Sequence, residues 1–256
     1  MPRPERTYRT DAIILRRHDF GEADRLLTIY TPEFGKLSAI SKGARRPTSR
    51  QTGHVELFAR TSLMLARGRE LDIVTQADIA DPYLPLHADL ERISYASYLV
   101  ELLDRFTEQG EQNSPLYHLL LDALGWVGEP DGDLRLTARY YELALLRLVG
   151  FQPDLFNCVL GGESITAADQ FFSAIDGGAV CAEHADGYEN PRMMPISLGA
   201  LKTLRYLQPR DYQSIRALRV RPDLHHEMEQ VMRFYVSFLL ERRLKSADFI
   251  QQLRSS

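Results

Sequence analysis

The amino-acid sequence predicts an α+β protein in which a small β-barrel precedes a helical domain. The first observation is a series of five short strand-like segments within residues 1–82, with no helix long enough for a parallel crossover between them. The second is a change of hydrophobic period after Pro82, from two residues to three and four. The third is a segment rich in glycine and turn residues at about 152–194. We therefore divide the chain into a barrel (1–82) and a helical domain (83–256) that carries a small irregular insertion.

Five segments of the N-terminal part are predicted to be strands because they are rich in β-forming residues and bounded by turn residues. The segment 36–41 alternates polar and apolar residues, as a half-buried strand does. Five strands in about 70 residues favour a small closed barrel such as the five-stranded OB-fold, although the strand count also fits other small barrels. The predicted strands cover residues 12–18, 25–31, 36–41, 55–66 and 71–79.

Five helices are predicted after residue 82 from apolar spacing and from residues that start or stop helices. Ser114 and Pro115 suit the start of the second helix, because proline fits the first helical position. Asp133 can cap the third helix, which Gly150 stops. The predicted helices are at about residues 90–110, 114–126 and 134–149, then a fourth that begins at Pro195–Ser197, and a long fifth at about 224–245.

The composition is that of an ordinary globular chain, with 44% hydrophobic residues among 256. The longest apolar runs are only a few residues, far short of the roughly 20 that a membrane-spanning helix needs. The N-terminal residues lack the apolar core of a secretion signal, and two cysteines are too few for a disulfide framework. We therefore expect a cytoplasmic protein.

The net charge of −4 is an average over unlike segments. Residues 1–80 contain 14 basic and 10 acidic residues, whereas the remaining 176 contain 17 and 25. The run from Ser41 to Arg50 has four cations and no acid, and a second basic cluster extends from Lys202 to Arg221. Local patches of this kind, more than net charge, govern binding to a phosphate backbone. A charge run is also common on a plain solvated surface, so its surroundings decide between the two interpretations.

Both cysteines lie in the insertion. Cys181 and His184 have the C-x-x-H spacing of half a zinc knuckle, whereas Cys158 is followed by Gly161 where a second ligand belongs. Three interpretations stay open at this point: a metal-free segment, a structural zinc with a substitute ligand, or a catalytic zinc with three ligands and a water. The substitute ligands considered are Asp186 and Glu183.

Other catalytic signatures are absent from the sequence. It contains no G-x-x-x-x-G-K-[ST] phosphate loop, no G-x-G-x-x-G and no G-x-S-x-G nucleophile elbow. No H-E-x-x-H or similar general-base spacing accompanies the cysteines. We therefore expect no enzyme activity and no cofactor apart from a doubtful zinc. A zinc-dependent hydrolase with Cys158, Cys181 and His184 as ligands is kept as an alternative.

Several stretches together resemble a known protein family. They are Asp19-Phe-Gly-Glu-Ala-Asp-Arg25, the turn Thr31–Lys36, the motif Ser41-Lys-Gly-Ala-Arg-Arg46 and the later Gly150-Phe-Gln-Pro-Asp-Leu155. In this combination the chain resembles the bacterial recombination mediators of the RecO family over essentially its whole length. In many members of that family the insertion carries C-x-x-C twice and binds zinc. The four corresponding positions here are Cys158, Gly161, Cys181 and His184, so at least one ligand is lost.

The resemblance implies a non-catalytic DNA-repair protein with an OB-fold barrel and a nucleoid-associated, cytoplasmic location. Such a protein binds single- and double-stranded DNA and anneals strands coated by single-strand-binding protein. It also works with RecR to load RecA. We expect the DNA contacts from Lys42, Arg45, Arg46 and Arg50, with Arg16, Arg17 and Arg25 on neighbouring strands as further candidates. The alternative is an adaptor that binds only proteins.

The acidic, Phe-ended tail of single-strand-binding protein needs an apolar pocket rimmed by arginine. Arg135, Arg139 and Leu143 are spaced by four residues, so they share one face of the predicted third helix. We therefore expect Arg135 and Arg139 to bind that tail. The alternative role for both is salt bridging to the acidic half of the chain.

Overall fold

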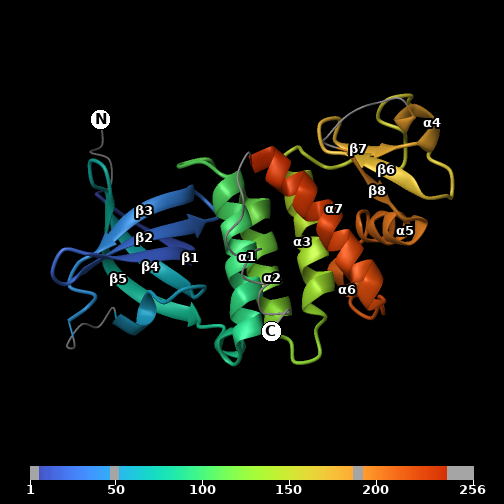
Figure 1. Cartoon of the computed structure of the whole chain (residues 1–256). Coiled ribbons are helices and arrows are strands. Elements are labelled where there is room, and N and C mark those ends of the chain that lie inside the picture. The colour runs from blue at the N-terminus through green and yellow to red at the C-terminus, as the bar shows by residue number, and fades with distance from the viewer. Residues whose placement is uncertain (1–5, 47–51, 187–192, 241–256) are drawn as a thin grey trace. The chain divides into compact units, whose positions relative to one another are not determined.

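The computed structural model describes residues 6–46, 52–186 and 193–240 (Figure 1). Its contacts divide the chain into two compact units, Met1–Pro130 and Asp131–Ser256. The first unit therefore contains two helices in addition to the barrel strands. The division into domains at residue 82 stays a prediction.

The first unit begins with a closed five-stranded barrel. Its strands are hydrogen-bonded in the order β1-β2-β3-β5-β4, and β4 pairs back onto β1. All pairs are antiparallel except β3 with β5, which is the connectivity of an OB-fold. The predicted fold class, a barrel of this type followed by helices, is confirmed. The strands are β1 (Thr7–Phe20), β2 (Asp24–Thr31), β3 (Gly35–Ser41), β4 (Arg60–Ala66) and β5 (Asp72–Asp81).

A bulge in β1 allows this one strand to pair with both β4 and β2, which closes the barrel. The first half of this 14-residue strand pairs with β4 and the second half with β2, and the register shifts between Ile14 and Arg16. Such a bulge bends a strand, so one segment can serve two neighbours. Alternating side chains from all five strands then fill the interior, which contains Ala12, Ile14, Leu27, Ile29, Ala39, Leu63, Leu65 and Val74.

The predicted fourth strand is too long. Residues 55–59 are not extended, and β4 begins only at Arg60. Phe58 has a φ of 68°, a left-handed conformation that a bulky side chain rarely adopts and that interrupts a strand. The segment instead bonds across the β1 bulge, where Ile14 N–H donates to the carbonyl of Ala59 and Phe58 N–H to that of Ile14. Val55, Phe58 and Ala59 are buried, which explains why the pattern resembled a strand.

Helices α1 (Leu90–Phe106) and α2 (Ser114–Gly128) complete the first unit, together with the short 3-10 turns η1 (Thr52–His54) and η2 (Leu84–His87). The side chains of Asp89 and Asn113 cap the two α-helices by accepting backbone N–H groups. Helix α1 ends at Phe106, not near Gly110 as predicted, because Thr107 is extended.

A buried lysine occupies the C-terminal end of α1. The ammonium of Lys36, on β3, donates to the carbonyl oxygen of Asp104 at 2.7 Å and to its Oδ1 at 3.2 Å, and also to the carbonyl of Thr107. A terminal nitrogen of Arg16, on β1, lies 2.9 Å from Oδ2 of Asp104. Two barrel strands are thus tied to one carboxylate on α1. The lysine also satisfies carbonyl groups that a helix end leaves unpaired.

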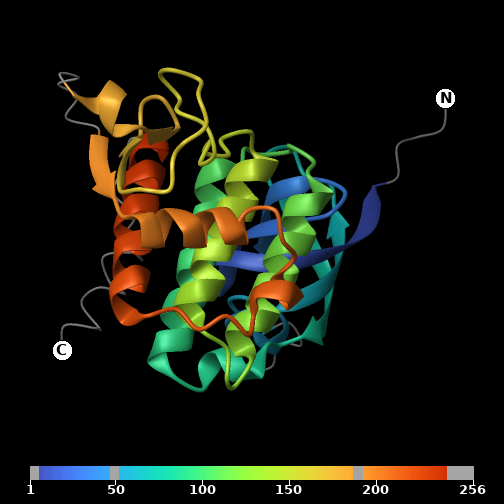
Figure 2. The same cartoon turned by 90° about the vertical axis from the view of Figure 1, so that its right-hand side faces the viewer.

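The second unit combines helices with a small sheet. Its elements are α3 (Leu134–Leu148), β6 (Gln170–Ser173), β7 (Gly178–Val180), α4 (Ala182–Ala185), β8 (Met193–Ile196), α5 (Leu198–Leu207), α6 (Tyr212–Ile215) and α7 (Pro222–Leu240). Helix α7 packs against α3 and α5, and Figure 2 shows α5 running across it.

The insertion is more regular than predicted, because β7, β6 and β8 form an antiparallel sheet in that order. Strands of three and four residues are too short for a period of two to stand out in the sequence. Pro195 lies in β8, and Ser197 is the residue that caps α5. Helix α7 is described to Leu240, so its predicted end near 245 falls outside the described residues.

The Lys36–Asp104 pair should be a major source of stability for the first unit. Lys36→Met leaves the carboxylate of Asp104, which is 7% exposed, with the half-exposed Arg16 as its remaining partner among the described residues. We expect a loss of about 3 kcal/mol in the free energy of unfolding, measured by urea denaturation. As a control, Asp78→Asn breaks the exposed 3.9 Å pair with Arg9 and should cost under about 1 kcal/mol. Equal, small effects of both variants would contradict the structural role of Lys36.

Candidate nucleic-acid interface

The basic loop, residues 41–46, is held to the barrel through its backbone. Gly43 has a φ of 66°, the left-handed conformation that glycine adopts readily, and its N–H donates to Oδ1 of Asp24 at 2.8 Å. The N–H of Arg45 donates to the carbonyl of Ala23 at 2.9 Å, and the side chain of Ala44 is buried in the barrel. The backbone of the loop and the buried Ala44 therefore hold the loop against the barrel.

The cations of the basic loop point to solvent. Lys42, Arg45 and Arg46 are all exposed, whereas Ala44 is buried. Nε of Arg45 lies 3.2 Å from Oδ2 of Asp19, and the two side chains are 37% and 63% exposed. An exposed pair of this kind contributes at most about 1 kcal/mol, so a phosphate can replace the carboxylate at little cost. Arg50, the fourth predicted contact, lies outside the described residues.

The predicted arginines on the strands are paired within the chain. Arg17 and Arg25 both bind Glu56, and Arg16 binds Asp104. Arg25 stands opposite Ser41 in the β2–β3 ladder and therefore adjoins the basic loop, but its side chain is only 16% exposed. The structure thus brings Arg25 to the loop and leaves Arg16 and Arg17 with structural partners. The DNA contacts assigned to these three stay predictions.

Phe20 is a candidate contact that the sequence reasoning missed. It ends β1 opposite Asp24, the residue that holds the basic loop, and its side chain is 51% exposed. Exposed aromatic rings beside cations are typical of proteins that bind single strands, because bases stack on the rings. In the sequence Phe20 is about twenty residues away from the basic motif, and only the pairing of β1 with β2 brings it opposite Asp24.

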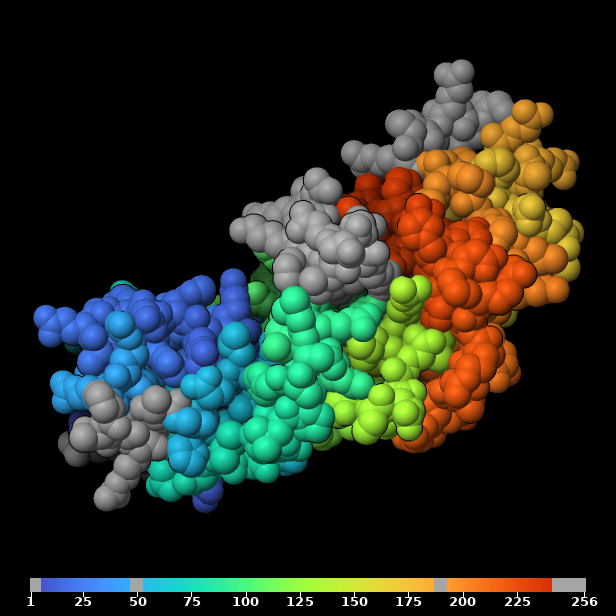
Figure 3. All heavy atoms as spheres, turned by 60° about the horizontal axis from the view of Figure 1, so that its bottom comes forward, coloured from blue at the N-terminus to red at the C-terminus, as the bar shows by residue number. Residues whose placement is uncertain are grey.

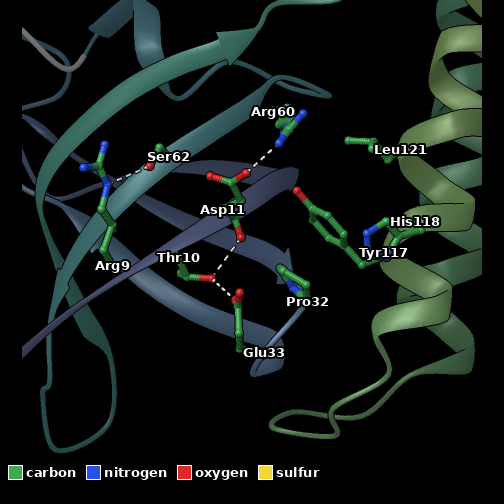
Figure 4. Close-up of a pocket in the computed structure, with 10 residues that line it drawn as sticks. All are labelled: Arg9, Thr10, Asp11, Pro32, Glu33, Arg60, Ser62, Tyr117, His118 and Leu121. Carbon is green, nitrogen blue, oxygen red and sulfur yellow. Dashed lines mark hydrogen bonds and ion pairs between the residues drawn. The ribbon is translucent and has the colours of Figure 1, made fainter.

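The surface of the barrel is visible in blue and cyan in Figure 3. A cleft of about 400 Å³ separates one side of the barrel from α2 (Figure 4). The hydroxyl of Tyr117 points toward Asp11 and Arg60, which form an ion pair at 2.7 Å. Burial, followed by the charge of Asp11, raises the pKa of Tyr117 to about 12, so this phenol stays neutral. Two arginines and two carboxylates line the cleft, so their charges balance and give no preference for phosphate.

The predicted tail-binding arginines differ in exposure. Arg139 is buried and lies 2.6 Å from Oε1 of Glu142, with side-chain exposures of 7% and 0%. Arg135, one turn earlier on α3, is half-buried. The helix face predicted to bind the tail is therefore buried at Arg139. A salt bridge, which was the alternative role for this residue, is present between Arg139 and Glu142. Tail binding by both residues stays a prediction.

Two cations of the second basic cluster are also engaged within the second unit. Nε of Arg205 donates to the carbonyl of Leu155. The guanidinium of Arg210 lies 3.7 Å from the ring centre of Tyr206. These contacts favour a structural role for this part of the cluster.

The predicted metal residues Cys158, Cys181 and His184 come together, and Glu163 joins them. One ligand atom from each of the four lies within 4.8 Å of the others. Among the described residues this group includes neither Asp186 nor Glu183, the substitute ligands expected from the sequence. Glu163 was missed because it stands outside any C-x-x-C or C-x-x-H spacing.

The pKa values of the two cysteines in this cluster are shifted in opposite directions. Burial alone would raise the pKa of the Cys158 thiol, but backbone N–H groups of Cys181, Gly161 and Leu160 that donate to its sulfur lower the pKa overall. Burial and a hydrogen bond to Glu163 raise the pKa of Cys181 to about 11. The same hydrogen bond is the largest cause that lowers the pKa of Glu163 to about 2. The surroundings of Cys158 thus favour its thiolate form, whereas the thiol of Cys181 donates a hydrogen bond to the carboxylate of Glu163.

Comparison with known proteins agrees with this architecture. Residues 5–83 match the family described as "Recombination protein O N terminal", and residues 87–248 match "Recombination protein O C terminal". The chain belongs to the RecO family. This is a family of DNA repair and recombination proteins. In the part of the chain that the structure describes, no helix is long and apolar enough to cross a membrane.

Relatives named DNA repair protein RecO align with almost the whole chain. The protein of Roseiflexus sp. (strain RS-1) is 43% identical over 250 residues, which are 98% of this chain and 87% of the relative. That of Pelotomaculum thermopropionicum is 38% identical over 245 residues, covering 96% and 94%. That of Desulforamulus reducens is 34% identical over 249 residues, covering 97% and 96%. The RecO resemblance stated from the sequence is confirmed.

Proposed function

We propose that this RecO-family chain is a non-catalytic recombination mediator that binds single- and double-stranded DNA and anneals complementary strands. The observation that carries the proposal is the basic loop, fixed by its backbone on a closed OB-fold barrel with its cations exposed. Phosphates that bind Lys42, Arg45 and Arg46 release condensed counterions, which drives association without reading sequence. Phe20 adds a ring on which a base can stack.

The proposal extends to partners. We propose that the chain acts on DNA coated by single-strand-binding protein, works with RecR and helps to load RecA in the cytoplasm, close to the nucleoid. Arg135 is the more accessible of the two arginines proposed for the partner's acidic tail. Unchanged binding of an acidic, Phe-ended peptide in Arg135→Ala would argue against this placement. Arg139→Ala is a poorer probe, since it leaves the buried Glu142 without its arginine.

The salt dependence of DNA binding tests the basic loop. Each phosphate contact contributes about −0.7 to the log–log slope of affinity against salt for single strands, so Lys42→Ala, Arg45→Ala and Arg46→Ala should each remove about 0.7. The triple variant should lose about 2. Arg147→Ala, which removes an exposed cation from α3, serves as the control and should leave the slope unchanged. Fluorescence anisotropy with a labelled oligonucleotide gives these slopes. An unaltered slope in the triple variant would favour the adaptor that binds only proteins.

Phe20 should contribute through stacking and not through charge. Phe20→Ala should weaken binding of a single-stranded oligonucleotide by about 1 to 3 kcal/mol without changing the salt slope. Duplex binding should change less, because paired bases are already stacked. Phe20→Tyr keeps an aromatic face and should retain the affinity of the natural protein. The role is wrong if Phe20→Ala affects single strands and duplexes equally, or if Phe20→Tyr is as weak as Phe20→Ala.

A further inference from the structure

Four side chains of types that can bind a metal converge at the edge of the small sheet. Cys158 and Glu163 lie on the segment between α3 and β6, Cys181 lies between β7 and α4, and His184 lies on α4 (Figure 1). Backbone bonds fix the two segments against each other, since Val159 N–H donates to the carbonyl of Ala179 at 2.9 Å. The cluster therefore rests on an ordered frame and does not depend on surface side chains meeting by chance.

The donor atoms have the spacing of a tetrahedral site. Nδ1 of His184 lies 3.0 Å from Sγ of Cys181, 3.6 Å from Sγ of Cys158 and 3.1 Å from Oε1 of Glu163. Zn²⁺ binds sulfur at about 2.3 Å and nitrogen or oxygen at about 2.0 to 2.2 Å, which places tetrahedral ligands about 3.3 to 3.8 Å apart. Shifts of a few tenths of an ångström convert the observed contacts into ligand separations. The residues present thus fit a zinc ion.

The same geometry speaks against a catalytic relay. In a nucleophile–histidine–carboxylate triad the nucleophile and the carboxylate bind opposite nitrogens of the imidazole ring. Here the thiol of Cys181 and the carboxylate of Glu163 both approach Nδ1 of His184. Convergence of all donors on one point is the arrangement of ligands around a shared cation.

Glu163 fills the place of a missing ligand. A side chain at Gly161 would point into the cluster, because a Cβ there would come within 2.1 Å of Oε2 of Glu163 and 2.2 Å of Cε1 of His184. The absence of a side chain at Gly161 therefore leaves a space beside Cys158. The carboxylate of Glu163, two residues further along the chain, occupies this space. Carboxylate oxygens are established zinc ligands, so the substitution preserves the number of donors.

We propose that Glu163 is the fourth ligand of a structural Zn²⁺ in this chain, in place of the cysteine that many RecO-family members have at the position of Gly161. Cys158, Cys181 and His184 are the other three ligands. Both thiols lose their protons to solvent when the ion binds, so the ion is held by two thiolates, a carboxylate and a neutral imidazole. The N–H groups of Gly161 and Cys181, 3.4 and 3.5 Å from Sγ of Cys158, stabilise the thiolate. Four protein donors leave no position for a substrate or a reactive water, which makes the site structural and not hydrolytic.

Metal content and spectroscopy of the whole chain test the proposal. Protein purified without chelators should contain about one zinc per chain by elemental mass spectrometry, the stoichiometry of a closed site. Replacement of Zn²⁺ by Co²⁺ should give the intense visible bands of tetrahedral cobalt together with sulfur-to-metal charge transfer. Glu163→Gln should lower zinc affinity by roughly 100-fold or more, since loss of an outer-shell partner alone costs 10- to 100-fold. Circular dichroism verifies that each variant is folded.

Matched variants separate the ligand from its neighbours. Glu183→Gln changes an exposed carboxylate one residue away from His184 and should leave zinc affinity and the cobalt spectrum unchanged. The double variant Gly161→Cys with Glu163→Ala returns a ligand to the glycine position. The ring of His184, which is 42% exposed, has to shift away from the new Cβ, and tetrahedral cobalt bands with stronger sulfur charge transfer should then return. Failure to bind zinc or cobalt, a Cys158–Cys181 disulfide in the purified protein, or full affinity in Glu163→Gln would each overturn the proposal.

Discussion

The carboxylate of Asp104 lies at the C-terminal end of α1, almost fully buried, and two cations from the barrel reach it. Burying a carboxylate is costly unless it is paired, so Lys36 and Arg16 are constrained to stay in place. They belong to β3 and β1, the strands on either side of β2. The start of β2 carries Asp24, which binds the basic loop. The buried network thus joins α1 to the two strands that flank β2, and the start of β2 in turn binds the backbone of the basic loop.

The cations of the barrel fall into two groups. Those on strands face carboxylates of the same chain, as Arg16 faces Asp104, Arg17 faces Glu56 and Arg60 faces Asp11. Those on the basic loop are exposed, and the carboxylate that Arg45 contacts is itself on the surface. The net charge of −4 is therefore no guide to the partner, because much of the charge is already neutralised internally. The local excess that remains on the basic loop is the feature on which the proposed DNA binding rests.

Local signals made part of the fold predictable from the sequence. The alternation in residues 36–41 identified β3. Asp133 was recognised as a helix cap and Ser197 as part of a helix start, because both signals depend on neighbouring residues. Other features depend on distant parts of the chain. The spacing of Arg135 and Arg139 gave their shared face correctly but not the burial of Arg139 against Glu142. Glu163 reaches the cysteines only because Gly161 leaves space and the sheet brings Cys181 close.

The central claim is that the basic loop carries the DNA function of this RecO-family chain. Annealing of complementary strands coated by single-strand-binding protein tests it most directly, with the natural chain compared with Lys42→Ala/Arg45→Ala/Arg46→Ala. Because the loop is fixed by its backbone, the variant should fold normally and yet anneal at least about tenfold more slowly, owing to three lost phosphate contacts. Annealing by the folded triple variant at the rate of the natural chain would contradict the account.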